Sequence, residues 1–279
     1  MNLSGRIGKE TTNQMQTQIS VIIPNYNGSK TLEAVIKSCL NQTLKPIEIL
    51  VCDDGSTDES KKIVGGINNN IVKWIPLPHS GTPAIPRNNG IRISEGEWIA
   101  FCDNDDEWLP TKLEKQISLA TKLDCKASCT NAIKKVNGIN IEKNMINYKK
   151  EKISFYDLLN SNSIVCSSSV VKKSILEKIG GFSEVLEHGS YADFICWLRV
   201  LTQTDFAFID ESLVIYDDHP RTSIRALFLD DKILRENALN NFIGWVGKQK
   251  RINLIFYLIQ IRIYNIIKLF KKVLNKILK

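Results

Sequence analysis

Residues 97–110 read EWIAFCDNDDEWLP, and this stretch decides the fold. Its apolar run from Ile99 to Cys102 predicts a short buried strand. The acidic residues that follow emerge past the carboxyl end of that strand, which is the edge of an open α/β sheet where ligands bind. Carboxylates crowded there repel one another unless a cation lies among them, and hard oxygen ligands suit Mg²⁺ or Mn²⁺. The alternative is an acidic turn that caps a helix beginning near Pro110.

Upstream of this stretch, short apolar runs alternate with helical patterns. Strands are expected over residues 19–23, 47–52, 71–76 and 98–102, and helices over 30–41, about 57–64 and 84–94. Ser29 is the expected N-cap of the first helix, and Thr57 or Asp58 that of the second. This alternating order predicts a parallel sheet with right-handed crossovers, and therefore an α/β fold.

Downstream of the acidic turn, the pattern is more mixed. Helices are expected over 111–123 and 191–202, and strands over 127–133, 165–171 and within 206–216. Residues 134–152 are rich in Asn and Lys, which leaves a hairpin and a loop as alternatives. The expected organisation is a flexible extension over 1–17, a catalytic α/β domain over 18–226 and a helical region over 227–279.

Charge and cysteine content narrow the class of protein. The net charge is +7, but nine Lys and Arg residues and no Asp or Glu lie from Lys248 onward, so the rest of the chain carries 28 basic and 30 acidic residues. This distribution argues against nucleic acid as a partner. The seven cysteines are odd in number, and their spacing does not match that of a metal site. They are therefore expected to be reduced core residues of a cytoplasmic protein. Residues 1–17 lack the apolar core of a signal peptide.

A second acidic strand end is expected at the same edge of the sheet. Asp53 and Asp54 follow the second expected strand and so lie on the edge that carries residues 103–106. A nucleotide across that edge would meet both segments. Asp54 could accept a hydrogen bond from a base or ribose, and Asp105 could hold a metal that bridges a diphosphate. Tyr26, at the first strand end, could stack on the base.

Five ordered motifs carry a resemblance to a known family. They are SVIIPNYNG (20–28), DDGSTD (53–58), Gly81 with RNNG (87–90), GEWIAFCDNDDEWLP (96–110) and Asp193 with WLR (197–199). With them the sequence resembles, over roughly residues 18–225, the family-2 inverting glycosyltransferases of the GT-A fold. The resemblance implies a Rossmann-like, mostly parallel central sheet flanked by helices, with a C-terminal helical extension here. It also implies a nucleotide-diphospho-sugar donor, one divalent metal and inversion at the anomeric carbon.

The resemblance implies a nucleotide-binding role for several matching residues. Pro24 and Tyr26 would line the base pocket, and Asp54 would accept a hydrogen bond from the uracil ring. Arg87 would lie near the base or the diphosphate. Asp103 would contact the ribose or a metal-bound water.

The same resemblance implies the metal ligands. Asp105 would bind Mn²⁺ or Mg²⁺ directly, with Asp103 as a helper. His219 lies in a polar loop that resembles the family's C-terminal loop, in which a His reaches the metal or the diphosphate. Arg221 and Arg225 could add phosphate contacts there. The alternative for this segment is a solvated loop with an incidental His.

Asp106 and Glu107 are expected to orient the acidic turn rather than bind the metal. Two positions depart from the family's pattern. Pro86 stands where the family often has Ala, and Ala192 stands where an acidic residue often precedes the base. Neither departure removes a group that the mechanism requires.

Direct displacement with inversion needs one base and one metal. An acceptor hydroxyl is weakly nucleophilic at neutral pH, so a carboxylate must take its proton during attack. A metal offsets the charge on the departing diphosphate, so no protein acid is needed. Asp193 is the expected base, because it lies near the start of a helix whose Trp197, Leu198 and Leu201 would face the core. The alternative is a simple helix-start Asp. His188 and His79 have weaker claims to a role.

The C-terminal tail predicts an amphipathic helix with a cationic polar face. Arg262 and Lys268 leave no apolar run near 20 residues, so the helix is expected to lie in the interface of an anionic membrane. The alternative is a helix packed on the catalytic domain or on a partner subunit. A chain ending near Val246 is expected to be a soluble enzyme. The apolar face comprises Ile255, Phe256, Ile259, Ile263, Ile266, Ile267, Phe270, Val273, Leu274 and Ile277.

These features together predict a cytoplasmic enzyme, peripheral at the inner face of the cell membrane. It would transfer a sugar from a UDP-sugar to a lipid-linked saccharide in surface-polysaccharide assembly, such as O-antigen or capsule. One alternative is a catalytically idle nucleotide-sugar-binding protein. The other is a metal-dependent phosphoryl-transfer enzyme, which would need a nucleophilic Asp with a supporting Lys and Thr on later strand ends. The sequence holds no such set.

Overall fold

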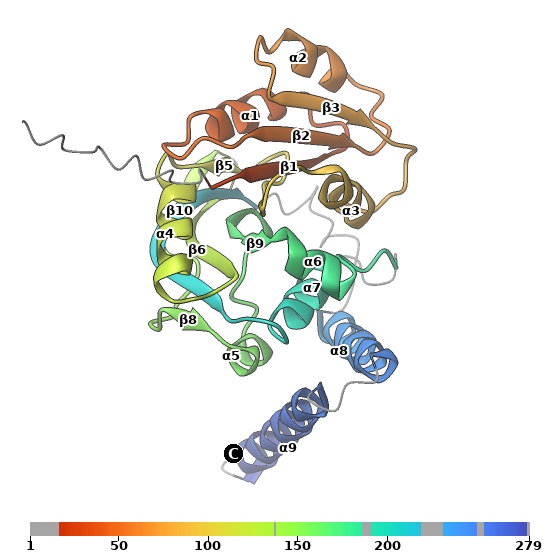
Figure 1. The fold of residues 1–279 in the computed structure, drawn as a ribbon. Helices are drawn as coiled ribbons and strands as arrows, with labels where there is room; N and C mark the ends of the chain where they lie inside the picture. Colours follow the sequence, from red (N-terminus) through yellow and green to blue (C-terminus); the bar gives the residue numbers. More distant parts are fainter. Residues whose placement is uncertain (1–16, 137, 186–190, 219–230, 250–253, 278–279) are drawn as a thin grey trace, which may run out of the picture.

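A computed structural model describes residues 17–136, 138–185, 191–218, 231–249 and 254–277. Its body is one ten-stranded sheet in the order β3-β2-β1-β4-β9-β6-β10-β5, with β7 beside β6 and β8 beside β10 (Figure 1). The strands are β1 Ile19–Asn25, β2 Glu48–Asp53, β3 Val72–Pro76, β4 Trp98–Phe101, β5 Glu107–Trp108, β6 Ala127–Val136, β7 Ile139–Glu142, β8 Lys152–Ile153, β9 Val170–Lys172 and β10 Phe206–Asp217.

Most of the sheet is parallel, as the sequence predicts. β1 pairs in parallel with β2 and β4, β2 with β3, and β6 with β10. β9, which lies between β4 and β6 in the sheet, departs from the parallel pattern and runs antiparallel to both neighbours. The expected α/β fold class, a mostly parallel central sheet flanked by helices, is confirmed.

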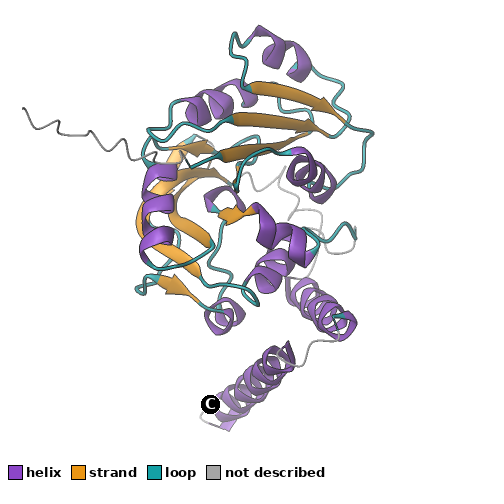
Figure 2. Ribbon diagram, in the orientation of Figure 1, coloured by secondary structure: helices purple, strands orange, loops and turns teal. Residues whose placement is uncertain are grey.

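Helices cover both faces of the sheet (Figure 2). Successive strand residues point to opposite faces, so Val21 and Ile23 join one apolar core while Ile22 joins the other. The first core includes α1, α2 and α4, and the second includes α3 and α5 to α8. The helices are α1 Leu32–Leu40, α2 Ser60–Gly66, α3 Ala84–Ile93, α4 Lys112–Lys122, α5 Phe155–Asn160, α6 Lys173–Ile179, α7 Ala192–Val200, α8 Asp231–Lys248 and α9 Ile255–Ile277.

The helix caps differ from the sequence expectations. Thr31, not Ser29, occupies the N-cap position of α1, and its hydroxyl donates to the main-chain carbonyl of Asn104 at 2.6 Å. The main-chain N–H of Ser29 instead donates to the Asp58 carboxylate at 2.9 Å. That contact holds the segment before α1 against the turn that follows β2. The N-cap position of α2 is Glu59, one to two residues after the expected caps, and the helix begins at Ser60.

Two segments of the second half also differ from expectation. The strand expected over 165–171 is a 3₁₀ turn, Cys166–Ser168, followed by the short β9. Its serine hydroxyls bond back to carbonyls three residues earlier, which competes with strand pairing: Ser168 donates to Val165 and Ser169 to Cys166. β6 and β7 pair antiparallel, so the hairpin is the alternative for the Asn- and Lys-rich region that the structure supports.

The C-terminal helices are part of the core rather than a detachable tail. α8 packs on α7, and α9 packs on α5. Leu254 and Ile261 are 1% and 2% exposed and belong to the same core as α7. Shortening the chain near Val246 would strip these residues, which argues against the expectation that such a fragment is an intact enzyme. No helix within the described residues combines the length and apolarity that a bilayer crossing needs.

Lys112, at the start of α4, is a charge buried beneath the acidic turn. It is fully buried, and its ammonium nitrogen lies 3.9 Å from the ring centroid of Trp108, with no hydrogen-bond partner among the described residues. Burial lowers the pKa of Lys112 from its ordinary value of 10.5 to about 7, against a smaller opposing effect of nearby cysteines. Because the folded-state pKa is below the unfolded one, the unfolded chain binds the extra proton. Stability attributable to this group therefore rises with pH between about 7 and 10.5.

We expect Lys112→Met to remove that pH dependence, since Met has a similar length and no charge to desolvate. From pH 7 to pH 9 the wild type should gain about 2 kcal/mol of unfolding free energy relative to Lys112→Met. Urea denaturation of both proteins at the two pH values measures the difference. Parallel stability changes in the two proteins would contradict the prediction.

Candidate active site

Three strand ends are joined by one buried amide, the side chain of Asn25. Its amide nitrogen donates to Asp53 Oδ1 at 2.9 Å, and its oxygen accepts from the amide of Asn104 at 2.9 Å. Asn25 ends β1, Asp53 ends β2, and Asn104 lies in the turn after β4. The two acidic segments therefore lie at one edge of the sheet, as the sequence predicts.

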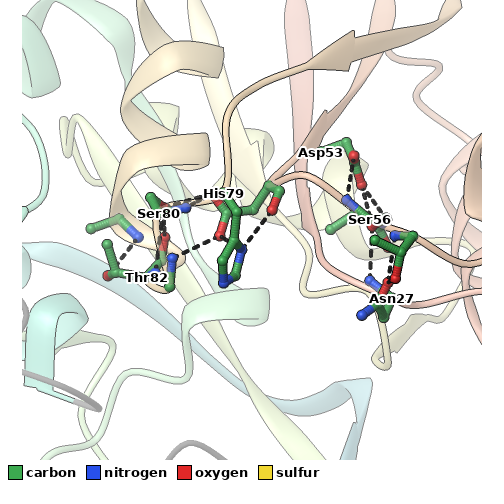
Figure 3. Close-up of polar contacts among 11 residues, drawn as sticks. Asn27, Asp53, Ser56, His79, Ser80 and Thr82 are labelled. Carbon is green, nitrogen blue, oxygen red and sulfur yellow. Dashed lines mark hydrogen bonds and ion pairs between the residues drawn. The ribbon is translucent and has the colours of Figure 1, made fainter.

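The turn after β1 fits tightly against this amide. A Cβ on Gly28 would lie 2.3 Å from Asn25 Oδ1 and 2.4 Å from Asn104 Nδ2, so only glycine fits there. Asn27 has φ of +50°, a left-handed conformation that Asn tolerates. Its main-chain N–H donates to the hydroxyl of Ser56 at 2.8 Å, and Ser56 also contacts Asp53 (Figure 3). These contacts fasten the turn to the end of β2.

The Asp54 carboxylate binds the loop that follows β3. Oδ1 accepts from the main-chain N–H and the hydroxyl of Ser80 at 2.9 and 2.6 Å. Oδ2 accepts from the N–H of Gly81 at 3.0 Å and lies 3.1 Å from His79 Nδ1. Asp54 is 4% exposed. The residue expected to meet the uracil ring is therefore surrounded by donors of its own chain.

Tyr26 and Pro24, the other expected base-pocket residues, differ in exposure. Pro24 is buried within β1. Tyr26 is 48% exposed, and its ring stacks on the imidazole of His79 with centroids 4.4 Å apart. His79 had only a weak claim to a role in the sequence analysis, because no local pattern shows that this loop returns to β1.

Arg87 pairs with Asp103, one of the expected site carboxylates. It is 5% exposed, and its Nη2 lies 2.5 Å from Asp103 Oδ1. Its guanidinium lies over the Phe182 ring, 5.3 Å from the centroid. Burial acts to lower the pKa of Arg87, but Asp103 and, more weakly, Asp193 outweigh burial and raise that pKa. Arg87 is thus a permanent cation between the acidic turn and the start of α7.

The acidic turn divides into an outer and an inner part. Asp105 is exposed and the side chain of Asp103 is 28% exposed. Asp106 is fully buried, and its Oδ1 accepts from the main-chain N–H of Asp217 at 2.9 Å. Burial, with the nearby Asp105 and Asp103 charges, raises the pKa of Asp106 well above its ordinary value. A buried Asp106 that accepts from the main chain of β10 suits the expected role of orienting the turn.

The outer carboxylates suit a hard cation chemically. Among the described residues, no three or more His, Cys, Asp or Glu side chains converge as a ready-made metal site. Mg²⁺ needs no such cage, because it commonly takes one or two carboxylates, waters and substrate phosphates. Asp105, with Asp103, offers that set. His219, the third expected ligand, lies outside the described residues, as do His188, Arg221 and Arg225.

Asp193 lies in the first turn of α7, partly exposed. Its Oδ1 accepts from the N–H of Phe194 at 2.6 Å, and the helix N-terminus favours its ionised form. Trp197, Leu198 and Leu201 are buried, which confirms the expected core-facing side of this helix.

Sequence reasoning missed two functional residues, Asn25 and Asn104. Each carries a donor and an acceptor, so each can join two neighbours at once. The available signal was their position beside carboxylates at expected strand ends.

Comparison with known proteins agrees with this geometry. A sequence profile of the family described as "Glycosyl transferase family 2" matches residues 20–180. The chain is 31% identical over 192 residues (69% of this chain, 73% of the relative) to UDP-Glc:alpha-D-GlcNAc-diphosphoundecaprenol beta-1,3-glucosyltransferase WfgD of Escherichia coli. It is 30% identical over 240 residues (84% and 73%) to GalNAc(5)-diNAcBac-PP-undecaprenol beta-1,3-glucosyltransferase of Campylobacter jejuni.

A solved structure shares the fold. The crystal structure of S. aureus TarS 1-349 in complex with UDP-GlcNAc superposes with a TM-score of 0.68 at 19% identity, over 82% of this chain and 66% of that one. The profile match spans the edge formed by β1, β2 and β4, where Asn25 gathers the acidic segments. By sequence and by fold, this chain belongs to glycosyl transferase family 2 and has the GT-A fold.

Proposed function

We propose that this glycosyltransferase moves a sugar, with inversion, from a UDP-sugar to a hydroxyl of a polyprenyl-diphosphate-linked saccharide at the inner face of the cell membrane. The observation that carries the proposal is the buried Arg87 bonded to Asp103 at the strand edge where Asn25 gathers the acidic segments. A cation there suits a diphosphate, and carboxylates on either side suit a metal and a base. The printed names of the Escherichia coli and Campylobacter jejuni relatives support the donor and acceptor classes.

The donor would lie across the carboxyl ends of β1, β2 and β4. Tyr26 and the loop held by Asp54 border the base side, and Arg87 borders the diphosphate side. Arg87 is desolvated and paired, so its position is fixed before the donor arrives. A fixed charge stabilises the developing negative charge on the leaving group without reorganisation.

Asp105 and Asp103 would hold one Mn²⁺ or Mg²⁺ together with the donor's phosphate oxygens. When bound, such an ion offsets negative charge on the departing diphosphate. Asp103 also bonds Arg87, so the two positive groups would share one carboxylate. The metal ion and the Arg87 guanidinium, which would both stabilise the negative diphosphate, would therefore lie at the same turn.

Asp193 would take the proton of the acceptor hydroxyl. Its place at the N-terminus of α7 keeps the carboxylate ionised, and its partial exposure leaves it open to an acceptor. Arg87 bonds Asp103, and the negative charge of Asp193 also contributes to the raised pKa of Arg87.

α9 packs on the body with one face and leaves another apolar face exposed, and that exposed face supports a membrane partner. α9 contacts the body through Ile261 and Tyr257, whose ring lies 4.7 Å from that of Phe155. A different face carries the large apolar side chains that are 39–73% exposed: Ile255, Phe256, Ile259, Ile263, Ile266, Ile267, Leu269 and Phe270. An exposed apolar stripe on a helix with flanking Lys and Arg fits an anionic bilayer interface.

Turnover tests the proposal directly. We expect one of UDP-Glc, UDP-Gal, UDP-GlcNAc and UDP-GalNAc to yield UDP in the presence of a polyprenyl-diphosphate-linked N-acetylhexosamine. Asp193→Asn should lower kcat by roughly 100-fold or more, since general-base catalysis contributes about 10²–10⁴. UDP affinity should change little, because Asp193 faces the acceptor.

Asp124→Asn is the matched control, because Asp124 lies in an exposed turn with φ of +52°, which Asn tolerates. Near-wild-type turnover by Asp193→Asn would reject Asp193 as the base. Absence of turnover with every donor would favour the idle nucleotide-sugar-binding protein.

Metal removal tests the proposed requirement for Mn²⁺ or Mg²⁺. We expect a chelator to abolish turnover and Mn²⁺ or Mg²⁺ to restore it. Asp105→Asn should raise the half-saturating metal concentration about tenfold or more, whether measured by turnover or by calorimetric metal binding with UDP present. Asp106→Asn should leave that concentration unchanged, because Asp106 is buried with a raised pKa and Asn has the same shape. Full activity in chelator would exclude the metal.

Vesicle sedimentation tests the membrane partner. We expect the full-length protein to pellet with anionic vesicles and much less with neutral ones. The double variant Ile266→Glu, Phe270→Glu should stay in the supernatant, because it places charges on the exposed face and leaves the core residues of α9 intact. Ile139→Glu, at an equally exposed position on β7, is the control and should still pellet. Equal pelleting of all three proteins would reject this face as the contact.

A further inference from the structure

Arg235, near the start of α8, contacts three other helices at once. Its Nη2 donates to the main-chain carbonyl of Leu159 in α5. Its guanidinium lies over the ring of Phe194 in α7, 5.2 Å from the centroid, and over the ring of Tyr264 in α9, 6.0 Å from the centroid. α8 therefore lies between the helix that carries Asp193 and the helix with the exposed apolar face (Figure 1).

These contacts use properties that only an arginine side chain combines. Leu159 lies in the last turn of α5, where main-chain carbonyls lack a partner within the helix and the helix dipole favours a cation. A planar guanidinium can donate to such a carbonyl while it lies against aromatic rings. A lysine ammonium has no plane to stack and no fork of donors. Arg235 is therefore suited to fix two aromatic rings relative to α5.

Phe194 is the contact that leads from Arg235 to the proposed base. The main-chain N–H of Phe194 donates to Asp193 Oδ1 at 2.6 Å. This N–H lies in the first turn of α7, where no helical carbonyl is available to accept from it. The Phe194 ring is fully buried and packs edge-on against Tyr191, with centroids 5.6 Å apart. The position of Phe194 therefore fixes one oxygen of the Asp193 carboxylate.

Tyr264 is the contact that leads from Arg235 to α9. With Tyr257 and Ile261 it forms a stripe at spacings of four and three residues, so the three side chains share one face of the helix. This face packs on the body, and Tyr264 is partly buried there. The side chains that follow, residues 265–271, are exposed. Tyr264 thus marks the point where α9 passes from the body to its exposed half.

We propose that Arg235 is a positioning residue for the Asp193 carboxylate and ties the orientation of that carboxylate to α9 through Tyr264. The guanidinium holds the Phe194 ring, and the Phe194 N–H holds Asp193 Oδ1. This inference rests on the proposed role of Asp193 as the base.

Loss of the guanidinium would act on the transfer step rather than on donor binding. Without it the Phe194 ring can shift, and the N–H that orients Asp193 shifts with it. Proton transfer to a misplaced carboxylate is slower, because general-base catalysis requires hydrogen-bond reach to the acceptor hydroxyl. The donor site is built on β1, β2, β4 and α3, which Arg235 does not touch in the contacts above. The KM for the UDP-sugar should therefore stay the same.

Turnover by full-length variants with a short-chain, water-soluble diphosphate-linked N-acetylhexosamine tests this assignment, because membrane binding then does not enter the rate. With the most active of the four UDP-hexoses, we expect Arg235→Met to lower kcat about tenfold and to keep the donor KM within about twofold. Arg92→Met is the matched control and should equal the wild type. It removes an exposed arginine that bonds Asn89 of its own helix.

A double variant separates positioning from a loss of folded protein. In an Asp193→Asn background, Arg235→Met should change the residual kcat by less than about twofold, because the carboxylate through which it acts is already replaced. A smaller fraction of folded enzyme would instead lower kcat by the same factor in both backgrounds. Tyr264→Leu should also lower kcat in the wild-type background, whereas Tyr264→Phe keeps the ring under the guanidinium and should restore it.

The outcomes separate this inference from the proposed base. Wild-type kcat in a folded Arg235→Met protein, or an equal loss in both backgrounds, overturns the positioning role of Arg235 alone. Should Arg235→Met fail to fold, Tyr264→Leu takes its place in the same two backgrounds, with Tyr264→Phe as its control, and the same comparison decides. Near-wild-type turnover by Asp193→Asn overturns the proposed base, and absence of turnover with every donor overturns the proposed function. Either result overturns this inference as well.

Discussion

The amide of Asn25 is the interaction on which the site depends. It is 2% exposed and joins the ends of β1 and β2 to the turn after β4. A buried carboxylate such as Asp53 is costly unless it is fully hydrogen-bonded, and Asn25 with Ser56 supplies those bonds. The same amide orients Asn104, which begins the exposed part of the acidic turn. Satisfying one buried charge thereby fixes the distance between the nucleotide side and the metal side.

Burial separates the acidic residues of this edge into two kinds. Asp53, Asp54 and Asp106 are at most 4% exposed, and their oxygens bind main-chain or hydroxyl donors that hold turns together. Asp103 and Asp105 keep access to solvent. A buried carboxylate that accepts from the main chain holds a turn in place, whereas an exposed carboxylate can bind a cation or a proton. Acidic residues that are adjacent in the sequence therefore have different roles at the same edge of the sheet.

Much of the fold follows from local pattern. The strands up to β4 and the start of α7 lie where apolar runs predict them, because each buries a regular face. The rest depends on contacts that no local periodicity encodes. His79 reaches Tyr26 across about 50 residues, and Arg87 of α3 reaches Asp103 in the turn after β4. α5 is a different case: the sequence analysis predicts no helix there, although its capping box of Ser154 and Asp157 is a local signal.

The C-terminal helices connect the helix that carries Asp193, the proposed base, to the exposed apolar face of α9. Arg235 of α8 lies over the ring of Phe194, next to Asp193, and also over Tyr264 of α9. Arg199 of α7 in turn donates to Asn241 of α8 at 2.9 Å. These contacts pack α7, α8 and α9 into one unit. A bilayer bound along the exposed face of α9 would then set the direction in which Asp193 meets a lipid-linked acceptor. Because orientation contributes to rate as strongly as chemistry does, an anchor packed against the base helix serves this reaction better than one on a flexible linker.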